Sequence, residues 1–510
     1  MSSVSATHAE QNGAGRPKLK RSLGLWMATA LVIGNMVGSG VFGLPASLAS
    51  TGPISLLSWI FTGAGAILLA LVFANLGRAY PETGGPYAYA RRAFGDFAGF
   101  WTAWGYWIAA WAGNAAIATI FVSYASVFWP SLGTDNVLAF TLGLSVIWVL
   151  TLANCAGARE SGIIQLVTTV LKFVPLLLIG LIGLFYMHSA NFTPFDPNHV
   201  TLVGHWHAIS FAATLTLWAF LGLESATVPA EEVKNPEKTL PRATILGTVV
   251  TTGLYVLATV AIMGVIPAAT LAGSNAPFAD AAREIFGSSV LGVSPDKLIA
   301  AVAMISTFGA LNGWILIQGR VPLAAAQDGL FPKAFAQVSG TRKTPVVGLV
   351  ASSVLLSGLM AMNYQSSLTD TFTKIIILAT LTTLVPYAFA AAGQLMLMFT
   401  DREKFSGRRL GLDAAIAMAA FAYSFWMIYG AGQEYIAQGF LLLMAGVPVY
   451  VFMRWRQSKA AVPDYVPEST LPPVRMFKEE RPLAPLGGAY RSASERRGGG
   501  LSAPPLCVVR

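Results

Sequence analysis

Two short segments of the sequence combine glycines with polar residues in a way that suits the binding of a small charged molecule. The first is Gly34-Asn-Met-Val-Gly-Ser-Gly40, and the second is Trp218-Ala-Phe-Leu-Gly-Leu-Glu-Ser225. Each glycine destabilises a helix by roughly 1 kcal/mol relative to alanine, so the three glycines of the first segment favour an interruption. An interrupted helix exposes amides at one new end, where an anion binds, and carbonyl groups at the other, where a cation binds.

Two ionisable residues lie in the middle of apolar stretches. Glu224 belongs to the second segment, and Lys172 lies in Thr168-Thr-Val-Leu-Lys-Phe-Val-Pro-Leu176. A charged group at the centre of a membrane costs at least about 2.5–3.5 kcal/mol, and such groups commonly serve function. We expect both residues to act in coupling, and Glu224 also in gating or pH sensing. The alternative is a structural ion pair or a side chain that extends to the membrane surface.

The composition predicts the elements that must position these residues. Hydrophobic residues make up 55% of the 510 residues and charged residues 11%, whereas a soluble domain carries about 25% charge. Spanning about 30 Å of hydrocarbon takes about 20 helical residues. The sequence therefore predicts an all-α polytopic membrane protein with twelve transmembrane helices, at 23–46, 53–77, 97–129, 137–156, 163–187, 208–229, 242–266, 298–320, 344–362, 371–397, 411–430 and 434–453.

Lysine and arginine indicate how the predicted helices are oriented. Of the 33 lysines and arginines, 29 fall in segments that share one side with the N-terminus, so we expect both termini in the cytoplasm. The domains expected are a basic segment at 1–22, the twelve-helix domain at 23–453 and a disordered tail at 454–510. The basic flanks suit the surface of the lipid bilayer better than a nucleic acid. The first 22 residues lack the apolar core of a signal peptide, and short loops favour a bacterial inner membrane.

The two glycine-containing segments lie in the first and sixth predicted helices. These positions correspond if helices 1–5 and 6–10 are repeats, and paired interruptions of this kind indicate a binding site at the middle of the membrane in inverted-repeat transporters. Gly34 and Gly38 also have the spacing of close helix packing, so the first segment alone would not decide between the two interpretations. The occurrence of both segments favours the binding site.

The ends of the interrupted helices predict which molecule binds. The amides of Ser39 and Gly40 would bind an anionic group. Carbonyl groups of Met36, Trp218 and Leu221 would bind an ammonium group. A zwitterionic α-amino acid presents both groups.

Four motifs resemble a known superfamily. They are Ile33-Gly-Asn-Met-Val-Gly-Ser-Gly-Val-Phe42, Gly84-Gly-Pro-Tyr-Ala-Tyr-Ala-Arg-Arg-Ala-Phe-Gly95, Leu215-Thr-Leu-Trp-Ala-Phe-Leu-Gly-Leu-Glu-Ser225 and Glu232-Val-Lys-Asn-Pro-Glu-Lys-Thr-Leu-Pro-Arg242. From about residue 23 to 453 the chain resembles the amino acid–polyamine–organocation superfamily. Within it, the chain is most similar to the basic amino acid/polyamine antiporters, especially the arginine/agmatine antiporters.

The resemblance implies a fold, an activity and the roles of individual residues. It implies a five-plus-five inverted repeat with broken helices 1 and 6, often a homodimer, and exchange of amino acids and/or their amine products by alternating access, without a cofactor. It implies that Ser39 and Gly40 hold the substrate carboxylate, and that carbonyls of Met36, Trp218 and Leu221 hold the α-amino group. It implies that Trp314 stacks on a distal cation, and that this distal end is lined by Ala109, Ala110, Asn114 and Ile117. The gating layers that it implies consist of Tyr106, Glu224, Trp314 and Tyr387. A tryptophan face attracts a cation by about 0.5–2 kcal/mol.

The chain departs from the arginine/agmatine antiporters at the distal end. Where those proteins offer a cysteine and a serine, it has Ala110 and Ala379, and Ile117 is bulkier than a methionine. Both alanines remove partners for a guanidinium. Besides arginine, the possible substrates therefore include a polyamine precursor, another amine or a neutral amino acid.

Lys172 indicates an alternative function. The arginine/agmatine and putrescine antiporters lack a lysine at the position of Lys172. Proton-coupled and exchanging amino acid transporters elsewhere in the superfamily carry one in helix 5. By resemblance, we expect Lys172 to bridge helix 5 to the unwound part of helix 1 and to make transport independent of sodium. The alternative to exchange is thus proton-coupled, sodium-independent amino acid uptake.

Two other classes of protein are disfavoured. A membrane enzyme would need clustered catalytic or metal-binding groups, but the five histidines avoid the interiors of the predicted helices, and the two cysteines have no metal-ligand spacing. We expect no catalytic residue, no metal site and no nucleotide-binding loop of the Gly-x-x-x-x-Gly-Lys-Ser/Thr type. Two broken helices with converging ends favour an occluded site over the open pore of a channel.

Overall fold

The structure of the chain is a computed structural model. It describes residues 23–461, apart from 82–83, 157–160, 199–200, 228–229, 231–232, 290–291, 340–343 and 406–409; the side chains of 161–170 and 458–461 are also outside the described part. The predicted N-terminal segment 1–22 and residues 462–510 of the predicted tail lie outside the described residues.

The regular secondary structure of the described residues is helical, apart from an isolated bridge between Leu23 and Val233. Short 3₁₀ helices occupy Pro53–Ser55, Pro130–Gly133, Leu184–Tyr186, Ser189–Phe192, Ser225–Thr227 and Lys333–Ala336. The α-helices are α2 (Leu25–Met36), α3 (Ser39–Ala49), α4 (Leu56–Ala79), α5 (Pro86–Phe94), α6 (Asp96–Ala125), α7 (Asn136–Cys155), α8 (Ser161–Gly183), α9 (Leu202–Trp218), α10 (Pro236–Val265), α11 (Ala268–Ala272), α12 (Pro277–Phe286), α13 (Pro295–Gln327), α14 (Val346–Asn363), α15 (Leu368–Thr400), α16 (Arg402–Phe405), α17 (Leu410–Gly430), α18 (Gln433–Met444) and α19 (Gly446–Ala461).

Ten helical segments within the described residues are long and apolar enough to cross a membrane. Each coincides with a predicted span, and they are Leu25–Ala49, Pro53–Ala79, Asp96–Ala125, Asn136–Cys155, Pro236–Val265, Pro295–Gln327, Val346–Asn363, Leu368–Thr400, Leu410–Gly430 and Gln433–Gln457. The two remaining predicted spans, 163–187 and 208–229, fall on α8 and α9. Helix α9 has 17 residues, fewer than the ~20 that a span requires. The chain is therefore an integral membrane protein with many membrane-crossing helices.

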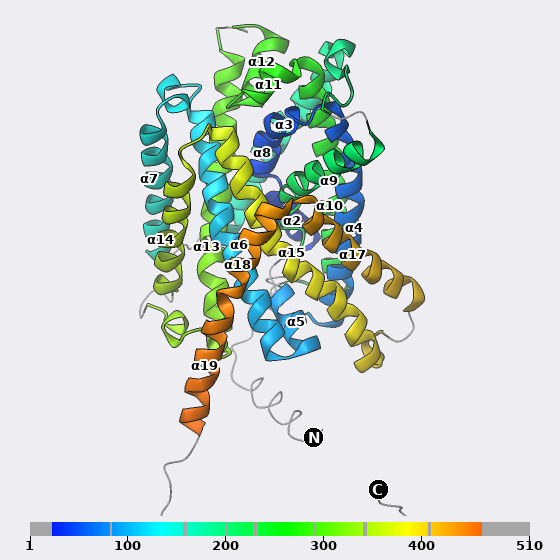
Figure 1. Cartoon of the computed structure of the whole chain (residues 1–510), viewed down its shortest axis with the longest axis vertical. Coiled ribbons are helices and arrows are strands. Elements are labelled where there is room, and N and C mark those ends of the chain that lie inside the picture. The colour runs from blue at the N-terminus through cyan, green and yellow to red at the C-terminus, as the bar shows by residue number, and fades with distance from the viewer. Residues whose placement is uncertain are drawn as a thin grey trace, which may run out of the picture. The chain divides into compact units, whose positions relative to one another are not determined.

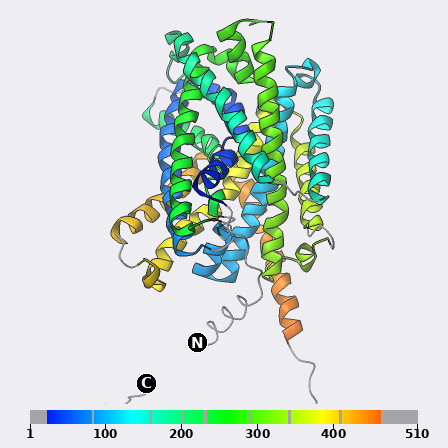
Figure 2. The ribbon, with the colours of Figure 1, turned by 180° about the vertical axis from the view of Figure 1, so that it is seen from behind.

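Two helices lie at the centre of the bundle. Helices α6 and α15 pack along each other, and most of their residues are buried (Figure 1). Helices α7 and α14 flank them on one side, and α4, α9, α10 and α17 lie on the other (Figure 1). From behind, α8 crosses the bundle against α10 and α13 (Figure 2). Outer helices such as α7 and α17 turn large apolar side chains outward, among them Val149, Leu152, Phe425 and Tyr429, as a hydrocarbon environment requires.

Glycine permits the close approach of the central helices. A Cβ atom placed on Gly105 of α6 would lie 2.9 Å from the carbonyl oxygen of Thr382 in α15 and 3.1 Å from the side chain of Leu443 in α18. The carbonyl belongs to the backbone of a buried helix, so it cannot move aside as a flexible side chain could. Any larger residue at Gly105 would push α6 and α15 apart.

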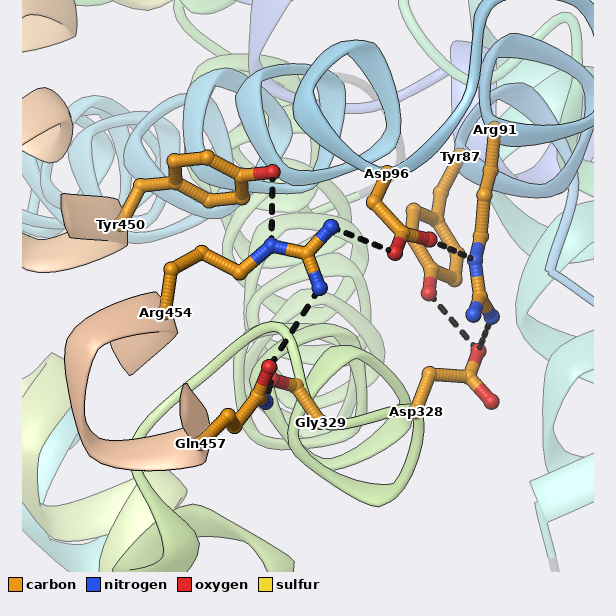
Figure 3. Close-up of polar contacts among 8 residues, drawn as sticks. All are labelled: Tyr87, Arg91, Asp96, Asp328, Gly329, Tyr450, Arg454 and Gln457. Atoms are coloured by element: carbon orange, nitrogen blue, oxygen red, sulfur yellow. Dashed lines mark hydrogen bonds and ion pairs between the residues drawn. The ribbon is translucent and has the colours of Figure 1, made fainter. Parts of the chain in front are cut away.

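A polar cluster ties several helices together at the end of the bundle that carries α5 (Figure 3). Arg91 of α5 contacts the carboxylates of Asp96 at 3.1 Å and Asp328 at 2.9 Å. The Tyr87 hydroxyl donates to Asp328 at 2.7 Å. Burial, and to a lesser extent the nearby Asp328 carboxylate, raise the pKa of this hydroxyl above its ordinary value. Arg454 of α19 reaches Asp96 at 3.0 Å. The cluster thus joins α5, the start of α6, the end of α13 and α19.

Helix α19 extends beyond the position at which the sequence predicts the last span to end. The prediction ends that span at 453, where the composition becomes polar, but α19 continues to Ala461. The side chain of Gln457 donates to the carbonyl of Gly329 at 2.5 Å, and Arg454 contacts Asp96. These contacts attach the first residues of the predicted tail to the membrane domain.

We predict that Gly105→Ala destabilises the protein. Overpacking between α6 and α15 should cost about 1–3 kcal/mol and lower the midpoint temperature of unfolding in detergent. Gly253→Ala in α10 is the matched control, because a Cβ there meets no atom within 4 Å. Equal midpoint temperatures for the two variants would show that the α6–α15 contact is not tight.

Candidate functional site

The first predicted interruption lies between α2 and α3. Helix α2 ends at Met36, and α3 begins at Ser39 after Val37 and Gly38. Gly38 has φ −136° and ψ −138°, and no side chain caps the start of α3. The first amides of α3, including those of Ser39 and Gly40, therefore lack partners within the helix.

The second predicted interruption follows α9. This helix ends at Trp218, and the chain then forms turns up to the 3₁₀ helix at Ser225–Thr227. Gly222 has φ +106°, a conformation that only glycine adopts readily. The Ser225 hydroxyl donates to the Gly222 carbonyl, which gives one exposed backbone group a partner.

The two interruptions lie against each other. A Cβ placed on Gly40 would lie 2.9 Å from both Cα and Cβ of Ala219, and one placed on Gly222 would lie 3.0 Å from Cβ of Asn35. The indole nitrogen of Trp218 donates to the Ser39 hydroxyl at 3.3 Å. The glycines therefore permit backbone-to-backbone contact between segments that are far apart in the sequence.

A tyrosine of α10 joins the two interruptions. The Tyr255 hydroxyl lies 2.6 Å from the carbonyl oxygen of Met36 and 2.9 Å from that of Ala219, and the side chain is fully buried. Tyr255 could not be selected from the sequence, because a single tyrosine in an apolar helix carries no local signal of its partners. Its position makes it part of the site.

Lys172 lies beside the first interruption. Its ammonium donates to the carbonyl of Gly34, in the last turn of α2, at 2.5 Å, and the side chain is buried. The described residues supply no carboxylate that forms an ion pair with it. The ammonium is thus held by a backbone dipole next to the interruption.

Glu224 lies in the second interruption and accepts three hydrogen bonds. Tyr106 of α6 donates to one carboxylate oxygen at 2.6 Å, and Tyr387 of α15 donates to the other at 2.7 Å. The amide of Gly222 donates to the second oxygen at 3.2 Å. The structure therefore brings together three of the four predicted gating residues and connects both central helices to the interruption.

The fourth predicted gating residue, Trp314, lines a small cavity beside this group. The cavity has a free volume of about 10 Å³, close to the space of one water molecule. Its lining comes from α6, the second interruption, α13 and α15, and consists of Tyr106, Ala109, Gly113, Trp218, Leu221, Trp314 and Thr383. The site residues predicted from the sequence do not include Gly113 and Thr383. Gly113 matters because a Cβ there would lie 2.7 Å from the Trp218 ring.

Four further predicted residues of the distal end are buried but do not line this cavity. They are Ala110, Asn114 and Ile117 of α6 and Ala379 of α15. The amide nitrogen of Asn114 donates to the side chain of Gln318 in α13 at 2.7 Å. Within the described part of the chain, no group of three or more histidine, cysteine, aspartate or glutamate residues is arranged to hold a metal ion.

The arrangement can bind a small molecule that carries opposite charges. Unpaired amides at the start of α3 suit a carboxylate, and carbonyl groups at both interruptions suit an ammonium. The rings of Trp218 and Trp314 border the cavity and can face a second cationic group.

Comparisons with known proteins identify the family of the chain. A family model described as "Amino acid permease" matches residues 23–452. A Bacillus subtilis protein named "Putative arginine/ornithine antiporter" is 34% identical, with 84% of this chain and 96% of the relative covered. The putrescine transporter PotE of Escherichia coli is 32% identical, with 84% and 95% covered. The cadaverine/lysine antiporter of Escherichia coli is 35% identical, with 72% and 82% covered.

A family match over most of the chain and relatives above 30% identity decide the family. The chain is a membrane transporter, not an enzyme, and it belongs to the basic amino acid/polyamine antiporters among the amino acid permeases of the amino acid–polyamine–organocation superfamily.

Proposed function

We propose that this transporter exchanges basic amino acids and the amines derived from them across the membrane by alternating access. The observation that carries the proposal is the contact between the two interrupted segments, at Gly40 with Ala219 and through Tyr255. Such a pair binds both charges of an α-amino acid and can separate to either side. The names of the relatives, which include arginine, ornithine, putrescine, cadaverine and lysine, support this class of substrate.

Each end of the substrate has proposed partners. The amides of Ser39 and Gly40 would hold the carboxylate, and backbone carbonyls of Met36, Trp218 and Leu221 would hold the α-amino group. The distal group would lie between Trp314 and the segment of α6 that contains Ala109, Ala110, Asn114 and Ile117, with Ala379 on α15. Tyr106, Glu224, Trp314 and Tyr387 would separate this site from one side of the membrane.

The distal end favours an ammonium over a guanidinium. A guanidinium presents five N–H donors in a planar fork, whereas an ammonium presents three donors at a point. Ala110 and Ala379 offer no polar group, and Asn114 is already engaged with Gln318 through its nitrogen. We therefore propose ornithine- or lysine-like amino acids and their diamines ahead of arginine and agmatine.

The proposal includes a topology. Helices α8 and α9 would complete twelve spans, with spans 1–5 and 6–10 forming an inverted repeat. The excess of lysine and arginine on one side supports cytoplasmic termini in a bacterial inner membrane, with 1–22 and 454–510 as cytoplasmic flanks. A homodimer belongs to the same proposal by family resemblance.

Proton-coupled, sodium-independent uptake of amino acids is the second candidate. The bond between Lys172 and the Gly34 carbonyl favours it, because a fixed ammonium beside the first interruption could take the place of a sodium ion. A proton on this amine would then be coupled to movement of α2.

Counterflow tests the proposed exchange. Proteoliposomes loaded with ornithine or putrescine should accumulate labelled ornithine much faster than empty vesicles, because an exchanger needs substrate on the far side. Liposomes without protein give the background. Equal uptake into empty vesicles under a proton gradient would favour the second candidate, and no uptake in either case would refute both.

Lys172→Ala should slow transport in either mechanism. A hydrogen bond from a charged group contributes about 1.5–3 kcal/mol, so we expect initial rates in proteoliposomes to fall by about ten- to hundredfold. Lys374→Ala is the matched control, because that lysine is exposed and contacts only the Ser366 hydroxyl among the described partners. Wild-type rates and unchanged sodium independence in Lys172→Ala would remove Lys172 from the coupling machinery.

Tyr255→Phe should weaken the contact between the two interruptions. The carbonyls of Met36 and Ala219 would lose their shared donor, and a buried polar group without a partner costs about 1–3 kcal/mol. We expect a lower unfolding midpoint and slower exchange. Tyr364→Phe, which removes a buried hydroxyl bonded to Thr119 at 3.3 Å, is the control. If both variants behave alike, Tyr255 has no special role at the interruptions.

A further inference from the structure

A chain of side-chain hydrogen bonds crosses four helices within the membrane domain. It begins at Thr151 of α7 and passes through Ser353 of α14 and Gln318 of α13 to Asn114 of α6, and all four side chains are fully buried. The two hydroxyl oxygens are 2.8 Å apart, Gln318 Nε2 lies 3.0 Å from Ser353 Oγ, and Asn114 Nδ2 lies 2.7 Å from Gln318 Oε1.

The direction of every bond in this chain follows from its first member. The Thr151 hydroxyl also lies 2.8 Å from the carbonyl oxygen of Ile147, which can only accept, and we assign the single hydroxyl hydrogen of Thr151 to that carbonyl. Ser353 must then donate its own hydrogen to Thr151. Its oxygen is left to accept from the NH₂ group of Gln318.

The same reasoning fixes the two amides. Because the NH₂ group of Gln318 faces Ser353, its carbonyl oxygen faces Asn114. Asn114 must turn its NH₂ group toward that oxygen. The amide oxygen of Asn114 is the free end of the chain, and it is buried without a hydrogen-bond partner among the described residues.

Asn114 is next in sequence to Gly113, which lines the small cavity, although its own side chain is not part of the lining. Gln318 lies one helical turn after Trp314, which also lines it, so both residues occupy the same face of α13. A buried acceptor without a partner costs free energy that a ligand can recover by donating a hydrogen bond.

We propose that Thr151, Ser353 and Gln318 are positioning residues that orient the Asn114 amide, so that its oxygen accepts a hydrogen bond from the distal ammonium of the substrate. If the chain ran in reverse, Asn114 would present its NH₂ group and repel a group that only donates. The inference rests on the proposed function, since it assumes a substrate with a distal ammonium. In this proposal, Thr151 of α7 favours cationic substrates without contacting them, because it acts through Ser353, Gln318 and Asn114.

The test compares ornithine with norvaline, which has the same carbon chain but lacks the distal ammonium. Thr151→Val removes the hydroxyl that fixes the direction of the chain and keeps the shape of the side chain. Binding is measured by ligand-induced thermal shift on the purified full-length protein. We expect the dissociation constant for ornithine to rise by about tenfold, and the response to norvaline to keep its wild-type value.

Two further variants separate orientation from packing. Thr151→Ser keeps the hydroxyl and should restore wild-type affinity for ornithine. Thr141→Val, on the same helix, removes a hydroxyl bonded only to its own helix among the described contacts and should leave both ligands unaffected. Ser353→Ala leaves the NH₂ group of Gln318 without its acceptor and should reproduce the effect if Thr151→Val does not fold.

The outcomes are distinguishable. The inference is supported if Thr151→Val weakens binding of ornithine but not of norvaline, and if Thr151→Ser binds ornithine with wild-type affinity. Unchanged ornithine affinity in both Thr151→Val and Ser353→Ala, or equal losses for ornithine and norvaline, overturns it and leaves the proposed function intact. A wild-type protein that binds neither ligand contradicts the proposed function and this inference with it.

Discussion

A backbone group inside a membrane needs a partner, because hydrocarbon offers no hydrogen bonds. This constraint explains how the two interrupted segments persist. Several of their carbonyl groups accept hydrogen bonds from the Tyr255 hydroxyl, the Lys172 ammonium and the Ser225 hydroxyl, at or beside the interruptions. Glycines at 40 and 222 let the segments touch, so that each excludes lipid from the other. The candidate binding site therefore depends on the same contacts that stabilise the irregular backbone within the membrane domain.

The two buried charges are stabilised by dipoles and not by each other. Glu224 is held by two tyrosine hydroxyls and an amide, and Lys172 by a carbonyl. An ion pair between them would join α8 directly to the second interruption and oppose their separation. With neutral partners, each charge is hydrogen-bonded by its own set of groups, independently of the other charge.

Local patterns in the sequence predict the membrane helices and the interruptions, because apolar length and glycine content act on the chain nearby. The grouping of Tyr106, Glu224 and Tyr387 was available only through family resemblance. Tyr255, Thr383 and the chain from Thr151 to Asn114 could not be predicted, since each depends on which faces of distant helices meet. The end of the last helix was misplaced for a similar reason: polar composition suggested a tail at 454, but Arg454 and Gln457 find partners on other elements.

The Tyr255 hydroxyl has one hydrogen and faces two carbonyl oxygens. It can satisfy either in full but not both at once, so the closed arrangement is already one bond short of saturation. If the two interruptions separate, as the proposed alternating access requires, the Tyr255 hydroxyl can keep its hydrogen bond to the carbonyl that stays within reach. Because this contact lacks one hydrogen bond when it is closed, opening it would cost little free energy, which suits the transport cycle proposed above.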